Sequence, residues 1–204
     1  MAENNPAKRQ KSDSSARSVF VYTGGARRSV PKDVVRVKFD PSVVEVANRA
    51  FFSCQNLREL VLNNGLQKIG KHAFYNCKSL ESIALPSSIT EIADSAFFNC
   101  QNLRELVLNV GLQKIGEFAF WKCTSLECIS LPSSITDVGD CAFVYCENLR
   151  EVILHEGMGK IGMGAFSNCT SLQGITLPSS ITEVGNFAFD NCENLREVIL
   201  HEGM

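Results

Sequence analysis

Cysteine and histidine are the residue types in this sequence with the most specific chemistry. The nine cysteines and three histidines could in principle ligate a metal, form disulfides or act as nucleophile and base. Zinc and redox sites need close pairs such as C-x-x-C, and the sequence contains none. The nearest pairs, Cys123 with Cys128 and Cys141 with Cys146, are five residues apart. The spacing therefore predicts neither a metal site nor a redox motif.

Most of the cysteines belong to a regular series. Seven recur at a constant spacing of 23 residues: Cys54, Cys77, Cys100, Cys123, Cys146, Cys169 and Cys192. We interpret this series as small apolar side chains that fill a buried turn. An intracellular chain with an odd number of cysteines is expected to keep them reduced. Cys128 falls at an outward strand position and is expected to be the most reactive thiol.

Histidines and serines give no catalytic set. His155 and His201 occupy equivalent positions 46 residues apart, so their recurrence reflects duplication of the repeat units. The segment Thr23-Gly24-Gly25 lacks the pattern of a dinucleotide or phosphate loop. The sequence therefore predicts a protein that is not an enzyme and holds no cofactor.

The elements that carry these residues form a repeat. The dipeptide Ala-Phe begins at every twenty-third residue from Ala50 to Ala188, and columns of leucine, isoleucine and valine keep the same register. A unit of this size cannot bury its own apolar face, so units must stack. We expect an α/β leucine-rich-repeat solenoid of about seven stacked 23-residue units, with parallel strands and a short helical turn at each Ala-Phe-x-x-Cys. The phenylalanines should stack about 5 Å apart, as neighbouring strands do. Phe51, near one end, should contribute less stability than the central Phe120.

Each unit should contain two extended pieces. Runs such as Leu57–Leu62 alternate apolar and polar residues at their end, which predicts a strand with one side inward. A second, shorter piece is expected near Leu66–Gly70 or Ile89–Ala93. A period of 46 residues overlies the first, and residues 146–158 and 192–204 are identical.

The ends depart from the repeat. Val34, Val37, Phe39, Val43 and Val46 match the apolar columns one unit earlier and should form a degenerate first rung. We expect a disordered basic leader over residues 1–17, an N-terminal cap over 18–36, and a solenoid over 34–204 that lacks a C-terminal cap. An uncovered last strand is expected to self-associate through its edge.

The columns resemble those of the BspA-like leucine-rich repeats. The signature segments are L-P-S-S-I-T-E-(I/V), Ala-Phe-x-x-Cys and the strand L-x-x-(I/V)-x-L, and they cover residues 34–204. The commoner leucine-rich repeat places Asn or Cys where this chain has Gly65 or Ser88. The resemblance implies an extended α/β solenoid that binds other proteins, and some members of the family are surface adhesins.

Charge and hydropathy constrain the location and the partners. Residues 1–40 carry nine basic and four acidic side chains, and the remainder carries eleven basic and eighteen acidic ones, so the repeat body is not expected to bind nucleic acid. No apolar run is long enough to span a membrane or to serve as a secretion signal. We therefore expect an intracellular protein. The cluster Lys8-Arg9-Gln10-Lys11 could be a nuclear address, although a solvated tail is the favoured interpretation.

The outward strand positions are the best candidates for a binding surface. They combine alternating charges with β-branched side chains, and the candidate partner-binding residues are Arg58, Glu59, Val61, Glu81, Arg104, Glu105, Val107, Glu127, Arg150, Glu151, Ile153, Arg196 and Glu197. Opposite charges on neighbouring units could also pair with each other. Two interpretations stay open, a face that docks a partner protein and a solvated face without a ligand. The functions to weigh are an interaction solenoid, a structural or adhesive surface array, and a nuclear-associated factor.

Overall fold

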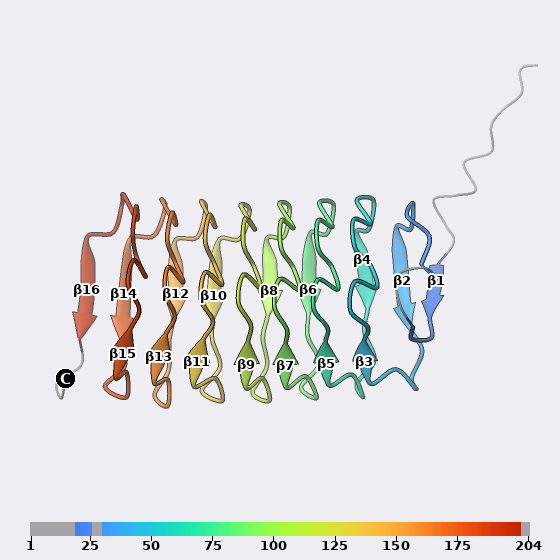
Figure 1. Cartoon of the computed structure of the whole chain (residues 1–204), viewed down its shortest axis with the longest axis horizontal. Coiled ribbons are helices and arrows are strands. Elements are labelled where there is room, and N and C mark those ends of the chain that lie inside the picture. Colours follow the sequence, from blue (N-terminus) through green and yellow to red (C-terminus); the bar gives the residue numbers. More distant parts are fainter. Residues whose placement is uncertain (1–18, 26–29, 201–204) are drawn as a thin grey trace, which may run out of the picture.

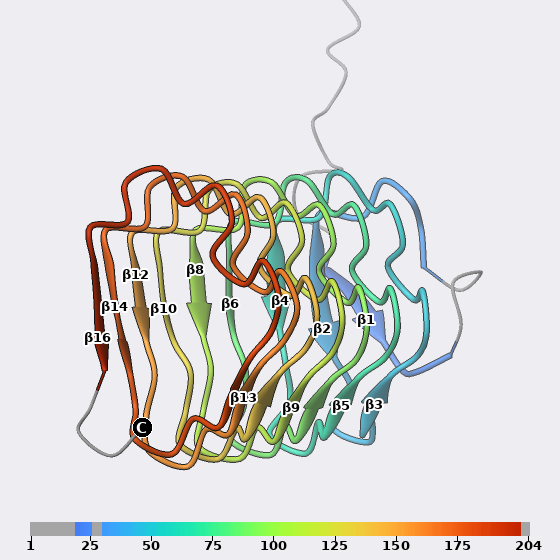
Figure 2. The same cartoon turned by 60° about the vertical axis from the view of Figure 1, so that its left-hand side comes forward.

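The chain winds into a stack of rungs, each formed by one 23-residue unit, along the long axis of the molecule (Figure 1). The computed structural model describes residues 19–25 and 30–200. The expected disordered leader over residues 1–17, with its basic cluster, therefore lies outside the described residues. Each complete rung contributes one longer and one shorter strand, which form two separate rows (Figure 2).

The long-strand row runs the whole length of the stack. Its members are β1 (Val19–Tyr22), β2 (Arg36–Phe39), β4 (Glu59–Val61), β6 (Ser82–Ala84), β8 (Glu105–Val107), β10 (Cys128–Ser130), β12 (Glu151–Ile153), β14 (Gly174–Leu177) and β16 (Glu197–Leu200). Parallel hydrogen bonding divides the row into three sheets, β1-β2-β4, β6-β8 and β10-β12-β14-β16. Alternation along these strands places one set of side chains inward and the other in solvent.

The short-strand row is one continuous parallel sheet of seven strands. Its members are β3 (Glu45–Val46), β5 (Lys68–Ile69), β7 (Glu91–Ile92), β9 (Lys114–Ile115), β11 (Asp137–Val138), β13 (Lys160–Ile161) and β15 (Glu183–Val184). The first residue of each strand alternates between acid and lysine from rung to rung. Two of these neighbours form ion pairs at 2.9 Å, Lys68 with Glu91 and Lys160 with Glu183. Because these side chains are substantially exposed, each pair adds about 1 kcal/mol or less.

Phenylalanine side chains form the centre of the core, as the repeat predicts. The rings from Phe51 to Phe189 stack on successive rungs with centroids 5.0 to 5.7 Å apart. All of them except Phe189 are completely buried. On the N-terminal side, Tyr22 of β1 packs against Phe39 and Phe51 at 5.0 Å. The apolar residues of the degenerate first rung are also buried, and its strand β2 pairs in parallel with β4.

The expected helical turns are absent, and the α/β class is wrong in this respect. No α-helix occurs among residues 19–25 and 30–200. In the segment 95–100, the N–H groups of Ser95, Phe97 and Asn99 donate to carbonyl oxygens of the next rung, while the alternate N–H groups donate to the carbonyl three residues earlier in the same rung. An α-helix needs every one of these donors for its own i−4 carbonyls. Ser95 and Asn99 also adopt the left-handed conformation, with φ of 54° and 59°, which interrupts any helix.

Cysteine stabilises these turns through its thiol as well as its size. The Sγ of Cys100 lies 3.2 Å from the carbonyl oxygen of Phe74 on the preceding rung, and that of Cys123 lies 3.4 Å from Phe97. Each thiol can therefore donate a weak hydrogen bond to the preceding rung while filling an apolar space. Burial raises the pKa of the Cys100 thiol to about 12.

Candidate functional site

Reactive side chains do not converge anywhere in the described part of the chain. All nine cysteines are free thiols, and Cys128 of β10 is exposed. Among residues 19–25 and 30–200, no group of three or more His, Cys, Asp or Glu side chains could hold a metal ion. None of these residues belongs to a helix long and apolar enough to cross a membrane.

Ser130 and His155 are the one serine and histidine that meet among the described residues. The Oγ of Ser130 lies 3.4 Å from Nε2 of His155, and both residues are exposed on the long-strand row. A serine nucleophile needs a closer base and a third group that orients the imidazole. Within the described residues, no carboxylate is hydrogen bonded to His155. His72, in contrast, is half-buried, and burial followed by the nearby Arg49 lowers its pKa.

The thirteen residues predicted as a partner-binding face all lie in solvent on the long-strand row. Each of them is exposed. Some belong to β4, β8, β12 or β16, and the others directly precede a strand of the long-strand row. The β-branched members are notable for their exposure, at 57% for Val61, 52% for Val107 and 41% for Ile153. We call this exposed surface the long-strand face.

Bulky and small residues alternate along the long-strand face. Glu105 is in register with Ser82, and Val107 is in register with Ala84. The same relation places Glu151 beside Gly174. Since neighbouring strands are about 5 Å apart, the bulky rungs recur about every 10 Å as ridges separated by shallower rungs.

Ion pairing on this face is sparser than the charge pattern allows. Of the ion pairs among the described residues, the one on the long-strand row joins Arg36 Nε to Glu59 Oε2 at 3.0 Å. The alternating residues Arg58, Glu81 and Arg104 form none, although they are exposed on successive rungs. Their charges are therefore available to a partner.

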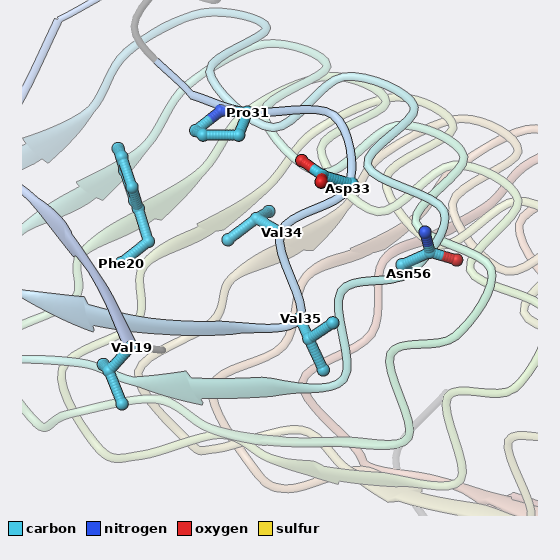
Figure 3. A pocket seen from close by; sticks show the side chains of 7 residues that line it. All are labelled: Val19, Phe20, Pro31, Asp33, Val34, Val35 and Asn56. Carbon is cyan, nitrogen blue, oxygen red and sulfur yellow. The ribbon is translucent and has the colours of Figure 1, made fainter. Parts of the chain in front are cut away.

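Two hollows open near the long-strand row. One, of about 260 Å³, lies above Gly174 between the ridges of β12 and β16, with Glu151 and Glu197 in its lining. The other, of about 460 Å³, lies beside β1 and is lined mainly by apolar residues such as Phe20 and Val34 (Figure 3). Asp33 and Asn56 are among its few polar groups, and they do not form a catalytic arrangement.

A second aromatic ladder was missed at the sequence level. The rings of Phe52, Tyr75, Phe98 and Trp121 stack on successive rungs at 4.7, 4.6 and 4.3 Å, and they are half-buried at the turns. The available signal was the residue directly after each Ala-Phe, which is aromatic in the first four units. Because the ring faces cover each other, this ladder stabilises the N-terminal rungs and offers mainly ring edges to solvent.

Two parallel strand rows, ladders of identical side chains and an exposed strand face define a leucine-rich-repeat solenoid. The model of the BspA type leucine rich repeat region matches six copies over residues 32–150 and 113–204, and the chain belongs to this family. Leucine-rich-repeat solenoids are in general protein-interaction or surface repeat proteins.

Solved structures share the fold. A leucine-rich repeat protein of T. pallidum is 31% identical with a TM-score of 0.70, over 76% of this chain and 77% of that one. Another from Bacteroides ovatus is 31% identical with a TM-score of 0.77, over 83% of this chain and 46% of that one. The pneumococcal vaccine antigen PcpA, at 17% identity and a TM-score of 0.53 over 89% of this chain and 55% of that one, shares the fold alone. No curated protein matches the chain.

Proposed function

We propose that this chain is a non-catalytic interaction protein that binds a partner protein through its long-strand face. The observation that carries the proposal is the row of β-branched side chains exposed to water at Val61, Val107 and Ile153, at 41 to 57%. Folding does not require apolar residues there. Burial against a partner would stabilise a complex by about 25 cal/mol per Å² of apolar surface before the costs of association. The unpaired arginines and glutamates beside the row would set orientation and specificity.

Glutamate at two ridge positions tests the proposal. Tagged full chains carrying Val107→Glu or Ile153→Glu should stay folded, because both sites are exposed, and should lose a partner that co-purifies with the unchanged chain. The matched control is Val110→Glu, at a position that is 75% exposed and outside the strands. Quantitative mass spectrometry of the co-purified proteins gives the measurement. A partner that is retained by the ridge variants, or lost equally with Val110→Glu, contradicts the proposal.

An intracellular location forms part of the same proposal. The nine free thiols of the described residues suit a reducing compartment. Cell fractionation provides the test, since tagged protein on the outer surface would favour a structural or adhesive surface role instead. A nuclear role depends on the basic residues near the start, so an unchanged location after deletion of residues 1–17 would remove it.

Self-association through the edge at β16 stays a prediction. This strand pairs with β14 on one side, and Val198, Ile199 and Leu200 are 44 to 56% exposed. Among the described residues, no strand pairs with its other side, and a strand edge in this state can accept another strand. Sedimentation analysis over a range of concentrations should show dimers or larger species, and a monomer at all concentrations would refute it.

A further inference from the structure

A second exposed apolar surface lies at the corner where the short-strand row meets the turns. Phe118 is 39% exposed, Met163 48% and Phe187 71%. Backbone hydrogen bonds connect this corner across rungs, from the Phe118 N–H to the Asp140 carbonyl at 3.0 Å and from the Cys141 N–H to the Met163 carbonyl at 2.8 Å. Phe118 and Met163 therefore lie on one corner two rungs apart, with Cys141 on the rung between them, and Phe187 lies one rung beyond Met163.

Neither burial nor backbone conformation explains why phenylalanine occupies positions 118 and 187. Phe118 and Phe187 adopt left-handed conformations with φ of 55° and 61°. Bulky residues are disfavoured there, although the left-handed conformation recurs at this position on every rung. The two rungs between the phenylalanines carry smaller residues, Cys141 and Gly164. Exposed apolar rings of this size also favour association over solubility. Contact with a partner would explain why such rings occupy a strained, solvent-facing position.

A hollow of about 470 Å³ lies over the short-strand row, and its lining includes Glu117, the residue that precedes Phe118. Its floor includes Gly116 and Gly139, where a side chain would collide with the backbone of the neighbouring rung at less than 3 Å. Four carboxylates and two ammonium groups line it: Asp94, Glu117, Asp137, Asp140, Lys114 and Lys160. Asp94 is paired with Lys71 at 2.7 Å and Lys160 with Glu183, so the three remaining carboxylates and Lys114 leave a net charge of −2.

One of the two ammonium groups that line the hollow already forms an ion pair. Lys160 pairs with Glu183 at 2.9 Å on the far side. Lys114 and Asp137 are strand partners, yet they form no ion pair, and Asp137 Oδ2 instead accepts a hydrogen bond from Thr136 at 2.7 Å. Aspartate is one methylene shorter than the glutamates that pair with lysine on other rungs. Asp137 therefore faces the hollow without forming an ion pair among the described residues, although Lys160 interacts with it electrostatically from the next strand.

Glu117 and Asp140 complete the negative rim. Glu117 is exposed and forms no ion pair within the described part of the chain. Asp140 uses one oxygen to accept the Met163 N–H at 2.8 Å and forms no ion pair there either, its interaction with Lys160 being longer in range. The apolar corner is thus bordered by unneutralised carboxylates on successive rungs.

We propose that this acidic corner, formed by Phe118, Met163 and the hollow beside Glu117, docks a basic amphipathic segment of a partner protein. A large apolar side chain of that segment would pack against Phe118 and Met163, where burial gives affinity. A lysine or arginine would extend into the hollow beside Glu117 and Asp137, where charge complementarity gives orientation and a faster encounter. This surface is separate from the long-strand face, so one chain would hold two different partners or two parts of one.

Fluorescence anisotropy with a labelled amphipathic peptide of leucine and lysine tests the inference on the full chain. The peptide should bind, and its affinity should fall as ionic strength rises, because salt screens exposed charges. A peptide of the same pattern with glutamate in place of lysine should not bind. Equal binding of both peptides, or binding of neither, overturns the proposal.

Matched variants locate the bound peptide. Phe118→Asn removes the ring but suits the left-handed conformation, so the fold should persist, and Glu117→Gln removes one charge. Each should weaken binding about fivefold or more, as expected for a residue near the centre of an interface. The controls are Tyr145→Asn, at a residue 38% exposed with φ of 59°, and Glu105→Gln on the long-strand face, and both should leave affinity within about twofold.

Three results would overturn the assignment. The first is an equal loss of affinity in the control variants. The second is weaker peptide binding after Val107→Glu, which would assign the peptide to the long-strand face. The third is a change of oligomeric state on Phe118→Asn in the absence of peptide, which would make the corner a contact between copies. Because Val107→Glu is also the test of the long-strand face, failure of one proposal is distinguishable from failure of the other.

Discussion

The side-chain amide of Asn99 donates a hydrogen bond from Nδ2 to Oδ1 of Asn76 at 2.8 Å, yet its own Oδ1 is buried and accepts none. Both residues occupy the same left-handed turn position on neighbouring rungs, with φ of 59° and 60°. The next rung has Lys122 at this position, so the amide ladder stops there. The Nζ of Lys122 lies instead 5.6 Å from the centroid of the Trp121 ring.

Replacing Lys122 with asparagine should therefore stabilise the fold by about 1 kcal/mol. The new amide would supply the missing donor to Asn99 Oδ1, worth about 1–3 kcal/mol, and asparagine suits the left-handed conformation. The loss of the cation–π contact would offset about 0.5–1 kcal/mol. Urea unfolding gives the measurement. Lys122→Gln provides the control, because a longer amide lacks both advantages, and it should not stabilise the chain. A gain for Lys122→Gln equal to that for Lys122→Asn would contradict the ladder argument.

The loss of stability when a core ring is truncated should depend on the side chains packed against that ring rather than on its place in the sequence. Phe120→Ala should lower the free energy of unfolding by about 3–5 kcal/mol. Phe51→Ala should cost about as much, because Phe51 is fully buried against Tyr22, Phe39 and Phe74. Phe189→Ala should cost less, since this ring is only partly buried. A smaller shift of the urea midpoint for Phe51→Ala than for Phe120→Ala would support the expectation from the repeat instead.

Replacement by alanine should affect stability very differently at two of the glycines. A Cβ at Gly139 would lie 2.7 and 2.8 Å from the backbone C and O of Gly116, which cannot move without shifting the rung. Gly139→Ala should therefore destabilise the chain by about 1–3 kcal/mol or more. A Cβ at Gly174 would meet its nearest atom, the carbonyl oxygen of Glu197, at an ordinary 3.5 Å, so Gly174→Ala should be nearly neutral. Thermal unfolding of both variants is a sufficient test, and equal shifts would be the contrary result.

Stability should decline in alkaline solution. Burial raises the pKa of Cys100 from 9.0 to about 12, and it raises the pKa values of Cys123 and Cys146 well above 9.0. The folded state then binds these protons more tightly than the unfolded state does. Their stabilising contribution is fully present below pH 9 and is lost as the pH rises through the folded-state values. The denaturant midpoint of the unchanged chain should fall from pH 8 upward, and the midpoint of Cys100→Ala should fall less steeply. Constant midpoints up to pH 11 would disprove this linkage.

Thiol reagents should separate the two kinds of cysteine. Cys128 lies in solvent on β10, whereas Cys54, Cys77 and Cys100 are completely buried. Under native conditions a maleimide should label Cys128 first, and Cys128→Ser should remove that fast phase without altering the slow labelling of the ladder thiols. Rapid labelling of the ladder at the same rate would show that the turns open frequently.

The sequence was sufficient to place the strands and the buried columns because one period governs both. Each apolar residue from Leu57 to Leu195 recurs in register, and parallel stacking brings equal positions together. The exposed face followed from the same argument, since residues such as Val107 alternate with buried neighbours. Whether that face binds a partner depends on a second molecule, about which a repeat contains no information.

The turn at each Ala-Phe-x-x-Cys could not be deduced from apolar spacing. A helical turn and the observed paired turns both bury Phe97 and Cys100. They differ in where alternate N–H groups donate, which is a property of neighbouring rungs rather than of the local sequence. The asparagines at positions 76, 99, 168 and 191 were the available signal, since asparagine tolerates left-handed backbone.

The ridges of the long-strand face repeat every two rungs, whereas the buried ladders repeat every rung. An in-frame insertion or deletion of a single 23-residue unit would leave the ladder of Phe97 and Phe120 continuous, so the altered chain should still fold. It would nevertheless put the Arg-Glu ridges on one side of the junction out of step with those on the other. Duplication of 46 residues preserves both periods. Variants that differ in length by a single 23-residue unit should therefore still fold. Only variants that differ by a pair of units should also keep the spacing of the ridges that a partner would recognise.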